Sequence, residues 1–177
     1  MPRNRGIFFV PIFQMHHMNT AEKHQEFMRI AIDLSEKNVF ESVGGPFGAV
    51  VVKDGQIIAQ SGNMVTSTND PTAHAEVSAI RLACKALETF DLSGCVIYTS
   101  CEPCPMCLSA IYWARIDTIY FGNTKSDAAA IGFDDQFIYE ELDKPANERK
   151  LPLHQLMRDE AQQAFRYWDN SALRTNY

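Results

Sequence analysis

The first strong pattern along the chain is an apolar stripe at helical spacing that begins after Asn19. Asn19 can cap a helix and Glu22 follows three residues later, an arrangement typical of a helix N-terminus. The stripe consists of Phe27, Met28, Ile30, Ala31 and Leu34. It predicts an amphipathic helix whose role is packing.

Two runs rich in β-branched residues follow in the segment GGPFGAVVVKDGQIIAQSG, residues 44–62. Asp54-Gly55 joins them, and this dipeptide accepts the positive φ angles of a tight turn. The segment therefore predicts a β-hairpin.

The rest of the chain alternates helix and strand signals. Asp70 and Pro71 predict the start of a helix that continues through residues 74–87, and Pro103 and Pro105 predict the start of another. CVIYTS after Gly94 and IDTIYFG at residues 116–122 read as strands, DAAAIG as a short helix or turn, and residues 160–168 as a terminal helix. This alternation predicts one layered α/β domain.

Length and charge narrow the functional classes. The chain has 177 residues, enough for one domain, and a net charge of −6, which disfavours a polynucleotide partner. No apolar run reaches the ~20 residues that a membrane span requires. We expect residues 1–19, which contain the apolar run IFFVPIF, to be a flexible N-terminal extension, and residues 20–177 to form the domain.

Cysteine spacing adds the first chemical signal. The five cysteines occupy positions 84, 95, 101, 104 and 107, three of them within seven residues. An odd number without an export signal indicates a reducing compartment, so we expect a cytoplasmic protein whose close-set thiols serve a metal or catalysis.

Two short motifs carry the chemistry: His74-Ala75-Glu76, and Pro103-Cys104-Pro105-Met106-Cys107. The combination H-x-E and P-C-x-x-C is typical of zinc-dependent nucleobase deaminases. His74, Cys104 and Cys107 would supply three zinc ligands and leave the fourth position to water. Glu76 would act as the proton shuttle while zinc-bound hydroxide attacks an amino-bearing ring carbon.

Other interpretations of these cysteines are weaker. Cys104 and Cys107 alone would suit a structural zinc site or a redox pair, but neither explains His74 and Glu76. Cys101 is the nearest rival ligand, although a packing role at the end of a strand is favoured. Cys84 and Cys95 fit ordinary core positions.

The sequence resembles the cytidine deaminase superfamily and, within it, the bacterial guanine deaminases. The resemblance rests on GGPFGAVVVKDG, STNDPTAHAEVSAIR, YTSCEPCPMCLSAIYWAR and GFDDQFIYEELDKPANER, and the last of these favours guanine. It implies a three-layer α/β/α sandwich with a mixed five-stranded sheet. It also implies zinc as the cofactor and hydrolysis of guanine to xanthine and ammonia.

The resemblance further implies a set of substrate contacts. Phe47 and Trp113 would form apolar walls, and Asn63 and Asp135 would hydrogen-bond to the purine. Tyr177, at the end of a C-terminal tail exchanged between the subunits of a homodimer, would reach a pocket. Each has an ordinary alternative: Phe47 and Trp113 as core, Asn63 as a turn residue and Tyr177 as a frayed end.

The chemistry of the side chains does not separate Asp134 from Asp135, and only the motif selects Asp135.

Related substrates also remain open, namely guanosine, an aminotriazine such as ammeline, cytosine or tRNA adenosine. Residues 134–177 carry nine acidic and six basic side chains, which disfavours tRNA. An intact Glu76 disfavours a zinc-binding module without activity. We therefore expect a small purine as the partner, and neither nucleic acid nor membrane.

Overall fold

The computed structural model describes residues 20–177. The expected extension at residues 1–19, and with it the predicted cap Asn19, lies outside the described residues. Within the described part, no helix is both long enough and apolar enough to cross a bilayer.

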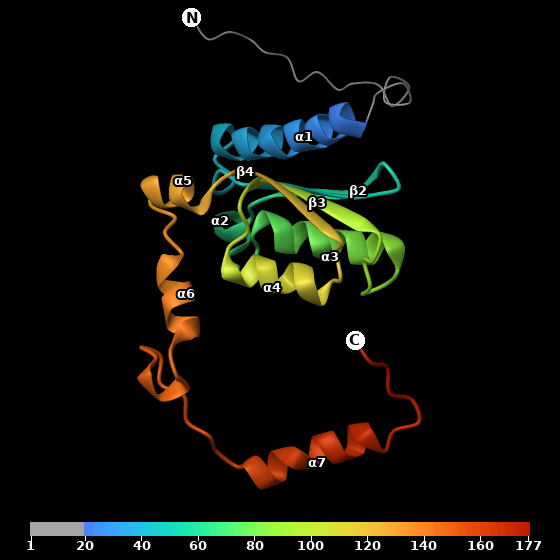
Figure 1. Ribbon diagram of the computed structural model, residues 1–177, viewed down its shortest axis with the longest axis vertical. Coiled ribbons are helices and arrows are strands. Elements are labelled where there is room, and N and C mark those ends of the chain that lie inside the picture. Colours follow the sequence, from blue (N-terminus) through green and yellow to red (C-terminus); the bar gives the residue numbers. More distant parts are fainter. Residues whose placement is uncertain (1–19) are drawn as a thin grey trace, which may run out of the picture.

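The domain is a mixed sheet of four strands between two layers of helices (Figure 1). The strand order is β2-β1-β3-β4; β1 is antiparallel to both neighbours, and β3 is parallel to β4. The strands are β1 (Gly48–Lys53), β2 (Gln56–Gly62), β3 (Cys95–Cys101) and β4 (Thr118–Asn123). Helix α1 (Thr20–Phe40) covers one face, and α3 (Ala75–Leu87) and α4 (Pro105–Trp113) cover the other (Figure 1).

Successive side chains along the central strands point to opposite faces of the sheet, so each face has its own hydrophobic core. Val50, Val52 and Tyr98 pack with Phe27 and Ala31 of α1. Ala49, Val51 and Ile97 belong to the cluster that the helices of the other layer complete. Both faces of β1 and β3 are thus buried, which agrees with the continuous apolar run of CVIYTS.

The predicted hairpin is confirmed. Asp54 and Gly55 have φ angles of 51° and 74°, which place both residues of the two-residue turn in the left-handed region. This turn joins β1 to β2 with the twist that antiparallel strands require.

The predicted start of the first crossover helix is wrong by several residues. Helix α3 begins at Ala75 with His74 as its N-cap residue, not at Asp70-Pro71. The Oδ1 atom of Asp70 instead accepts hydrogen bonds from the backbone N–H of Thr72 at 2.8 Å and from its hydroxyl at 2.7 Å. Asp70 therefore closes a local turn, a common alternative to capping for this residue.

The implied five-stranded sheet is also corrected, because the described residues form four strands in one sheet. Thr124 follows β4 directly and caps α5 (Lys125–Ala130) through a reciprocal capping box with Asp127. The residues after β4 thus turn into a helix and leave the edge of β4 unpaired by any described residue.

The C-terminal third extends away from the domain as an arc that returns toward α4 (Figure 1). The remaining elements are α2 (Val65–Thr68), α6 (Gln136–Asp143), the 3₁₀ helix η2 (Ala146–Glu148) and α7 (Arg158–Asp169). Helix α7 confirms the predicted terminal helix at residues 160–168.

Candidate active site and zinc centre

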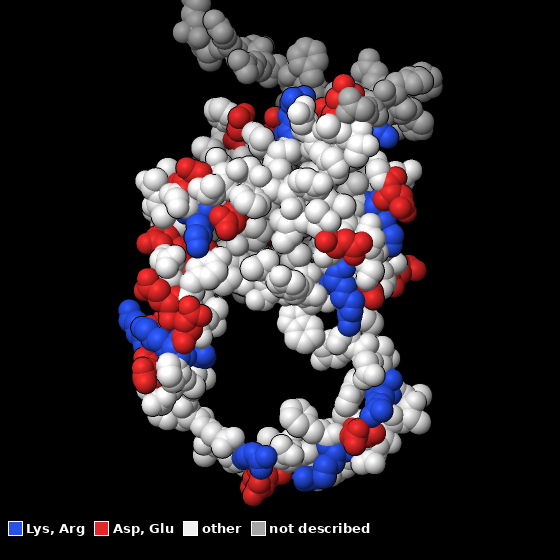
Figure 2. Space-filling view, in the orientation of Figure 1, with Lys and Arg blue, Asp and Glu red and all other residues white. Residues whose placement is uncertain are grey.

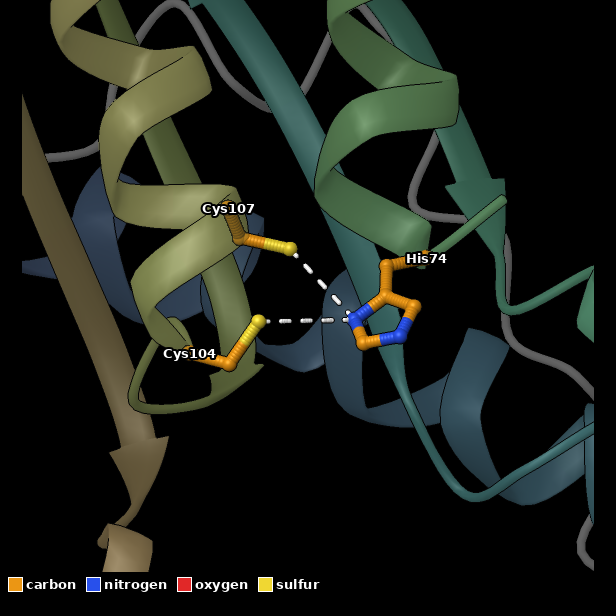
Figure 3. A group of neighbouring side chains, drawn as sticks. All are labelled: His74, Cys104 and Cys107. Carbon is orange, nitrogen blue, oxygen red and sulfur yellow. Dashed lines mark hydrogen bonds between the residues drawn. The ribbon is translucent and has the colours of Figure 1, made fainter. Parts of the chain in front are cut away.

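The three predicted zinc ligands come together where two helices begin. His74 is the N-cap residue of α3, and Cys104 is the N-cap residue of α4, with Cys107 in the first turn of the latter (Figure 3). Both N-cap residues have extended backbone conformations, so the chain turns sharply into each helix. Two helix N-termini thus converge on one point, where their unpaired N–H groups favour negatively charged sulfur.

The spacing of the three side chains fits a tetrahedral zinc ion. The Nδ1 atom of His74 lies 3.6 Å from the sulfur of Cys104 and 3.5 Å from that of Cys107. Zinc–nitrogen bonds of about 2.0 Å and zinc–sulfur bonds of about 2.3 Å at a tetrahedral angle separate nitrogen from sulfur by about 3.5 Å. One imidazole and two thiols leave one position open, as in a catalytic rather than a structural zinc site.

The electrostatics of this group suit a cation. A hydrogen bond from the Cys107 thiol lowers the pKa of Cys104 to about 4. The same hydrogen bond, together with burial, raises the pKa of Cys107. A hydrogen bond with Cys104 raises the pKa of His74. The three side chains therefore hold protons between them that a metal ion would replace.

Glu76 lies beside this group, in the first turn of α3. Its side chain is 5% exposed, and burial raises the pKa of its carboxyl group. The sulfur of Cys107 lies 3.4 Å from its Oε2 atom, so the carboxylate turns toward the ligands despite its two-residue offset from His74. A buried carboxyl group with a raised pKa is suited to taking up and releasing protons.

A cavity of about 600 Å³ opens in front of these side chains. His74, Glu76 and Cys104 form part of its wall. Its other lining residues come from the loop before β1, the segment between β2 and α3 that contains α2, the end of β3 and the segment from α5 to α6. The cavity therefore joins parts of the sequence that are far apart around the candidate metal centre.

The cavity includes three of the five predicted substrate contacts. Phe47, Asn63 and Asp135 line it, and the ring of Phe47 meets that of Phe133 edge to face at 4.9 Å. Trp113 and Tyr177 do not line it. Their rings lie 6.3 Å apart at the C-terminal end of α4, whereas the ligands lie at its N-terminal end.

The side chain of Asn63 is oriented by the backbone around it. Its Oδ1 atom accepts from the N–H of Val65 at 3.2 Å and from that of Gly45 at 3.4 Å. The buried amide of Asn38 at the end of α1 donates to the carbonyl oxygens of Asn63 and Gly45, which ties the two cavity loops together. Because the Oδ1 atom is occupied, the Nδ2 group of Asn63 is the part available to a ligand.

The two adjacent aspartates differ in environment. Asp134 is exposed, and its Oδ1 atom accepts from the backbone N–H of Gln136 at 3.0 Å. Asp135 is half-buried and makes no capping hydrogen bond, although it stands at the N-cap position of α6. Burial, with the negative charge of Cys104 nearby, raises the pKa of Asp135.

Several residues of the site were not found by sequence reasoning. Phe133 is the aromatic residue of GFDD, directly before the noted aspartates, and this position was the available signal. Thr99 donates to the Oε1 atom of Glu76 at 3.0 Å, and its polar side chain in a strand expected to be buried could have indicated it. Lys125, which also lines the cavity, carried no distinguishing signal in the sequence.

Comparison with protein families gives the decisive match. Residues 21–123 match the model described as the cytidine and deoxycytidylate deaminase zinc-binding region. The chain belongs to the cytidine and deoxycytidylate deaminase family. The family model describes a zinc-binding region. Among the described residues, the group whose ligand atoms lie close enough together to hold the metal consists of His74, Cys104 and Cys107.

Individual deaminases resemble the chain to different extents. It is 53% identical to the guanine deaminase of Bacillus subtilis over 154 residues, which cover 87% of this chain and 99% of that protein. The X-ray structure of Bacillus subtilis guanine deaminase superimposes with a TM-score of 0.85, at 52% identity, over 90% of this chain and 99% of that one. The tRNA-specific adenosine deaminase of Agrobacterium fabrum is 43% identical over 105 residues, 59% of this chain and 68% of that protein.

Proposed function

We propose that this deaminase hydrolyses guanine to xanthine and ammonia. The observation that carries the proposal is the extent of the match to Bacillus subtilis guanine deaminase. The aligned region is 154 residues long, which is more than the 123 residues up to the end of the zinc-binding region. The similarity therefore continues into the segment that contains Asp135. The shared part therefore includes a wall of the cavity as well as the metal centre.

His74, Cys104 and Cys107 would hold the zinc ion, because their donor types and spacing suit it. Bound there, zinc would act as a Lewis acid that lowers the pKa of water to about 7. Glu76 would take a proton from the attacking water and pass it to a ring nitrogen of guanine, and would then move the remaining proton of the added hydroxyl to the departing amine. Water thus supplies the oxygen of xanthine, and the exocyclic nitrogen leaves as ammonia.

The hydrogen-bonding groups of the cavity complement a purine that carries both donors and acceptors. The free Nδ2 group of Asn63 would donate to O6 or N7 of guanine. The carboxylate of Asp135 would accept from N–H groups of the same base. Phe47 would supply an apolar wall, supported in its orientation by Phe133.

The charge distribution supports a free base rather than a polynucleotide as the substrate. The net charge is −6, and on the face shown in Figure 2 the basic side chains are interspersed with acidic ones around a largely uncharged centre. A phosphate backbone would instead call for a continuous basic track. The five cysteines are free thiols, consistent with a reducing compartment.

We also propose that the protein is a homodimer in which the tails are exchanged. The arc formed by α6, η2 and α7 leaves an open space beneath the domain (Figure 2). Its apolar side chains are exposed, among them Leu156 at 83%, Phe165 at 72% and Leu173 at 92%. Such side chains need a partner surface, and a second copy of the chain would supply it.

The sheet offers a place for the exchanged tail. The outer edge of β4 is unpaired by the described chain, and residues 151–157, LPLHQLM, form neither helix nor strand and are exposed. An extended segment from a second copy could pair with this edge. The same exchange would bring Tyr177, at the end of the tail, to the neighbour's cavity, although in its own chain it lies beside Trp113 and away from the cavity.

A substrate panel tests the proposed activity. The zinc-loaded protein is incubated with guanine, guanosine, cytosine, adenine, ammeline and a tRNA, and ammonia release is followed together with identification of the products. Xanthine should form from guanine with the highest kcat/KM. No xanthine from guanine, or a higher kcat/KM for another member of the panel, would contradict the proposal.

The role of Glu76 is tested separately. Glu76→Gln preserves the shape of the side chain but cannot carry the proton, so it should keep one zinc ion per chain and lose nearly all turnover. Substantial remaining activity with full zinc occupancy would show that another group moves the proton.

A further inference from the structure

We propose that Thr99 is a positioning residue for the deamination: its hydroxyl holds the Oε1 atom of Glu76, so that the Oε2 atom carries the proton. This inference rests on the proposed function, in which Glu76 is the proton shuttle. It assigns unequal tasks to the two oxygens of one carboxylate.

The location of Thr99 supports this role. Thr99 lies in β3 between β1 and β4, paired with Ala49 on one side and Phe121 on the other. Alternation places its side chain on the same face as those of Cys95 and Ile97, which belong to the core under α3. It is 1% exposed and therefore introduces a hydroxyl into an otherwise apolar row, at the point where that row reaches Glu76.

The contacts around Glu76 distinguish its two oxygens. The Oε1 atom accepts from the Thr99 hydroxyl at 3.0 Å, whereas the Oε2 atom lies 3.4 Å from the sulfur of Cys107. The Oε2 atom thus faces the metal-binding side. A Cys107 thiolate would have no proton to donate, and the Thr99 hydroxyl would then be the neutral side-chain donor that fixes the carboxylate.

The hydroxyl of Thr99 has one proton and two acceptors within reach. The carbonyl oxygen of Cys101 lies 2.9 Å away, close to the 3.0 Å separation from Glu76. A charged carboxylate attracts the proton more strongly than a carbonyl oxygen, so the ionised form of Glu76 keeps the bond.

A purely structural explanation of Thr99 makes different predictions. Threonine is β-branched and suits a buried strand for packing alone. In that case valine, which has the same shape, would serve equally well. If the hydroxyl orients Glu76, serine should serve and valine should not.

Thr99→Val and Thr99→Ser are therefore compared with the wild type, each loaded with zinc and assayed with guanine. Loss of orientation in Thr99→Val should lower kcat by roughly 10- to 100-fold, because displacement of a catalytic group by about 1 Å has effects of this order. The KM for guanine and the zinc content should stay within about twofold, since neither depends on the hydroxyl. Thr99→Ser should restore kcat to within a few fold of the wild type.

Crystal structures of both variants give a readout that does not depend on turnover. The carboxylate of Glu76 should rotate away from its wild-type orientation in Thr99→Val and keep it in Thr99→Ser. A Thr99→Val variant with wild-type kcat, or a Thr99→Ser variant as slow as Thr99→Val, would overturn the inference. If the wild type does not deaminate guanine, the proposed function fails, and an unmoved carboxylate in Thr99→Val would refute the positioning role by itself.

Discussion

Asp134 accepts a hydrogen bond from the backbone N–H of Gln136 at 3.0 Å, which engages its side chain in the turn that leads into α6. The carboxylate of the adjacent Asp135 is half-buried, lines the cavity and is not used for capping. Two neighbouring residues of the same type thus have different tasks. The structure favours Asp135 as the group that would face a substrate.

Asp135→Asn should raise the KM for guanine by about 10- to 100-fold, because hydrogen bonds to a charged group contribute roughly 1.5–3 kcal/mol. Asp134→Asn is the matched control and should change KM by less than about threefold, since Asp134 binds the backbone. Steady-state kinetics of both variants, with zinc content verified, provide the measurement. Equal effects at the two positions would contradict the assignment.

The same carboxylate predicts a pH dependence. Burial raises the pKa of Asp135, so it becomes protonated at a higher pH than an exposed aspartate does. The protonated form accepts hydrogen bonds from guanine less well, and KM should therefore rise as the pH falls through this raised pKa. Asp135→Asn should lack this acidic rise in KM, whereas Asp134→Asn should retain it.

Asn63→Asp tests which end of the Asn63 amide faces the substrate. The substitution keeps the acceptor that holds the N–H groups of Val65 and Gly45, but replaces the free Nδ2 donor with a second acceptor. Guanine would then meet repulsion where it needs a donor. We expect the KM for guanine to rise by at least about 10-fold, because one buried hydrogen bond is lost and two acceptors then face each other.

The matched control is Asn63→Ala, which removes both ends of the amide. It should lower the melting temperature more than Asn63→Asp does, because the backbone N–H groups lose their acceptor in the alanine variant alone. A guanine KM for Asn63→Asp equal to that of the wild type would mean that the Oδ1 atom, not Nδ2, serves the substrate.

Removal of zinc by a chelator should abolish turnover and expose a reactive thiol. In the apoprotein the pKa of Cys104 is lowered to about 4, so its sulfur is a thiolate at neutral pH. Burial raises the pKa of Cys101 to about 11, which leaves roughly one thiolate in ten thousand at pH 7. Iodoacetamide followed by peptide mass analysis should therefore label Cys104 well before Cys101.

Readdition of zinc should restore activity and protect Cys104 from labelling. Cys101 serves as the internal control, because its reactivity should not depend on the metal in this way. Labelling of Cys104 at the same rate with and without zinc would argue against its role as a ligand.

Deletion of residues 171–177 should reduce guanine turnover by at least about 10-fold while zinc stays bound, because a closed cavity excludes water and a truncated tail leaves it open. Deletion of residues 151–177 should in addition convert the dimer into a monomer, as measured by light scattering. Tyr177→Ala separates the contribution of the terminal ring from that of the tail. A fully active 171–177 deletion, or a wild-type monomer, would contradict the exchanged-tail proposal.

Local signals in the sequence predicted much of the fold. The Asp54-Gly55 turn and the buried run of β3 follow from short-range preferences, and the structure has both. The start of α3 did not follow, because Asp70 can cap a helix or close a turn with nearly the same local chemistry. The expected fifth strand was also wrong, because whether β4 gains a neighbouring strand depends on residues that are far away in the sequence.

The sequence by itself determined the metal chemistry of this protein. One histidine and two cysteines in short, rigid motifs at helix starts restrict their side chains strongly, so spacing alone predicts a tetrahedral site with an open position. Only the tertiary structure decided which polar groups remain free in the cavity. Backbone N–H groups orient the side chain of Asn63, and burial sets Asp135 apart from Asp134. Both conditions arise from contacts between distant segments. The task of Thr99 has the same origin, because no local pattern relates a residue of β3 to a carboxylate on α3.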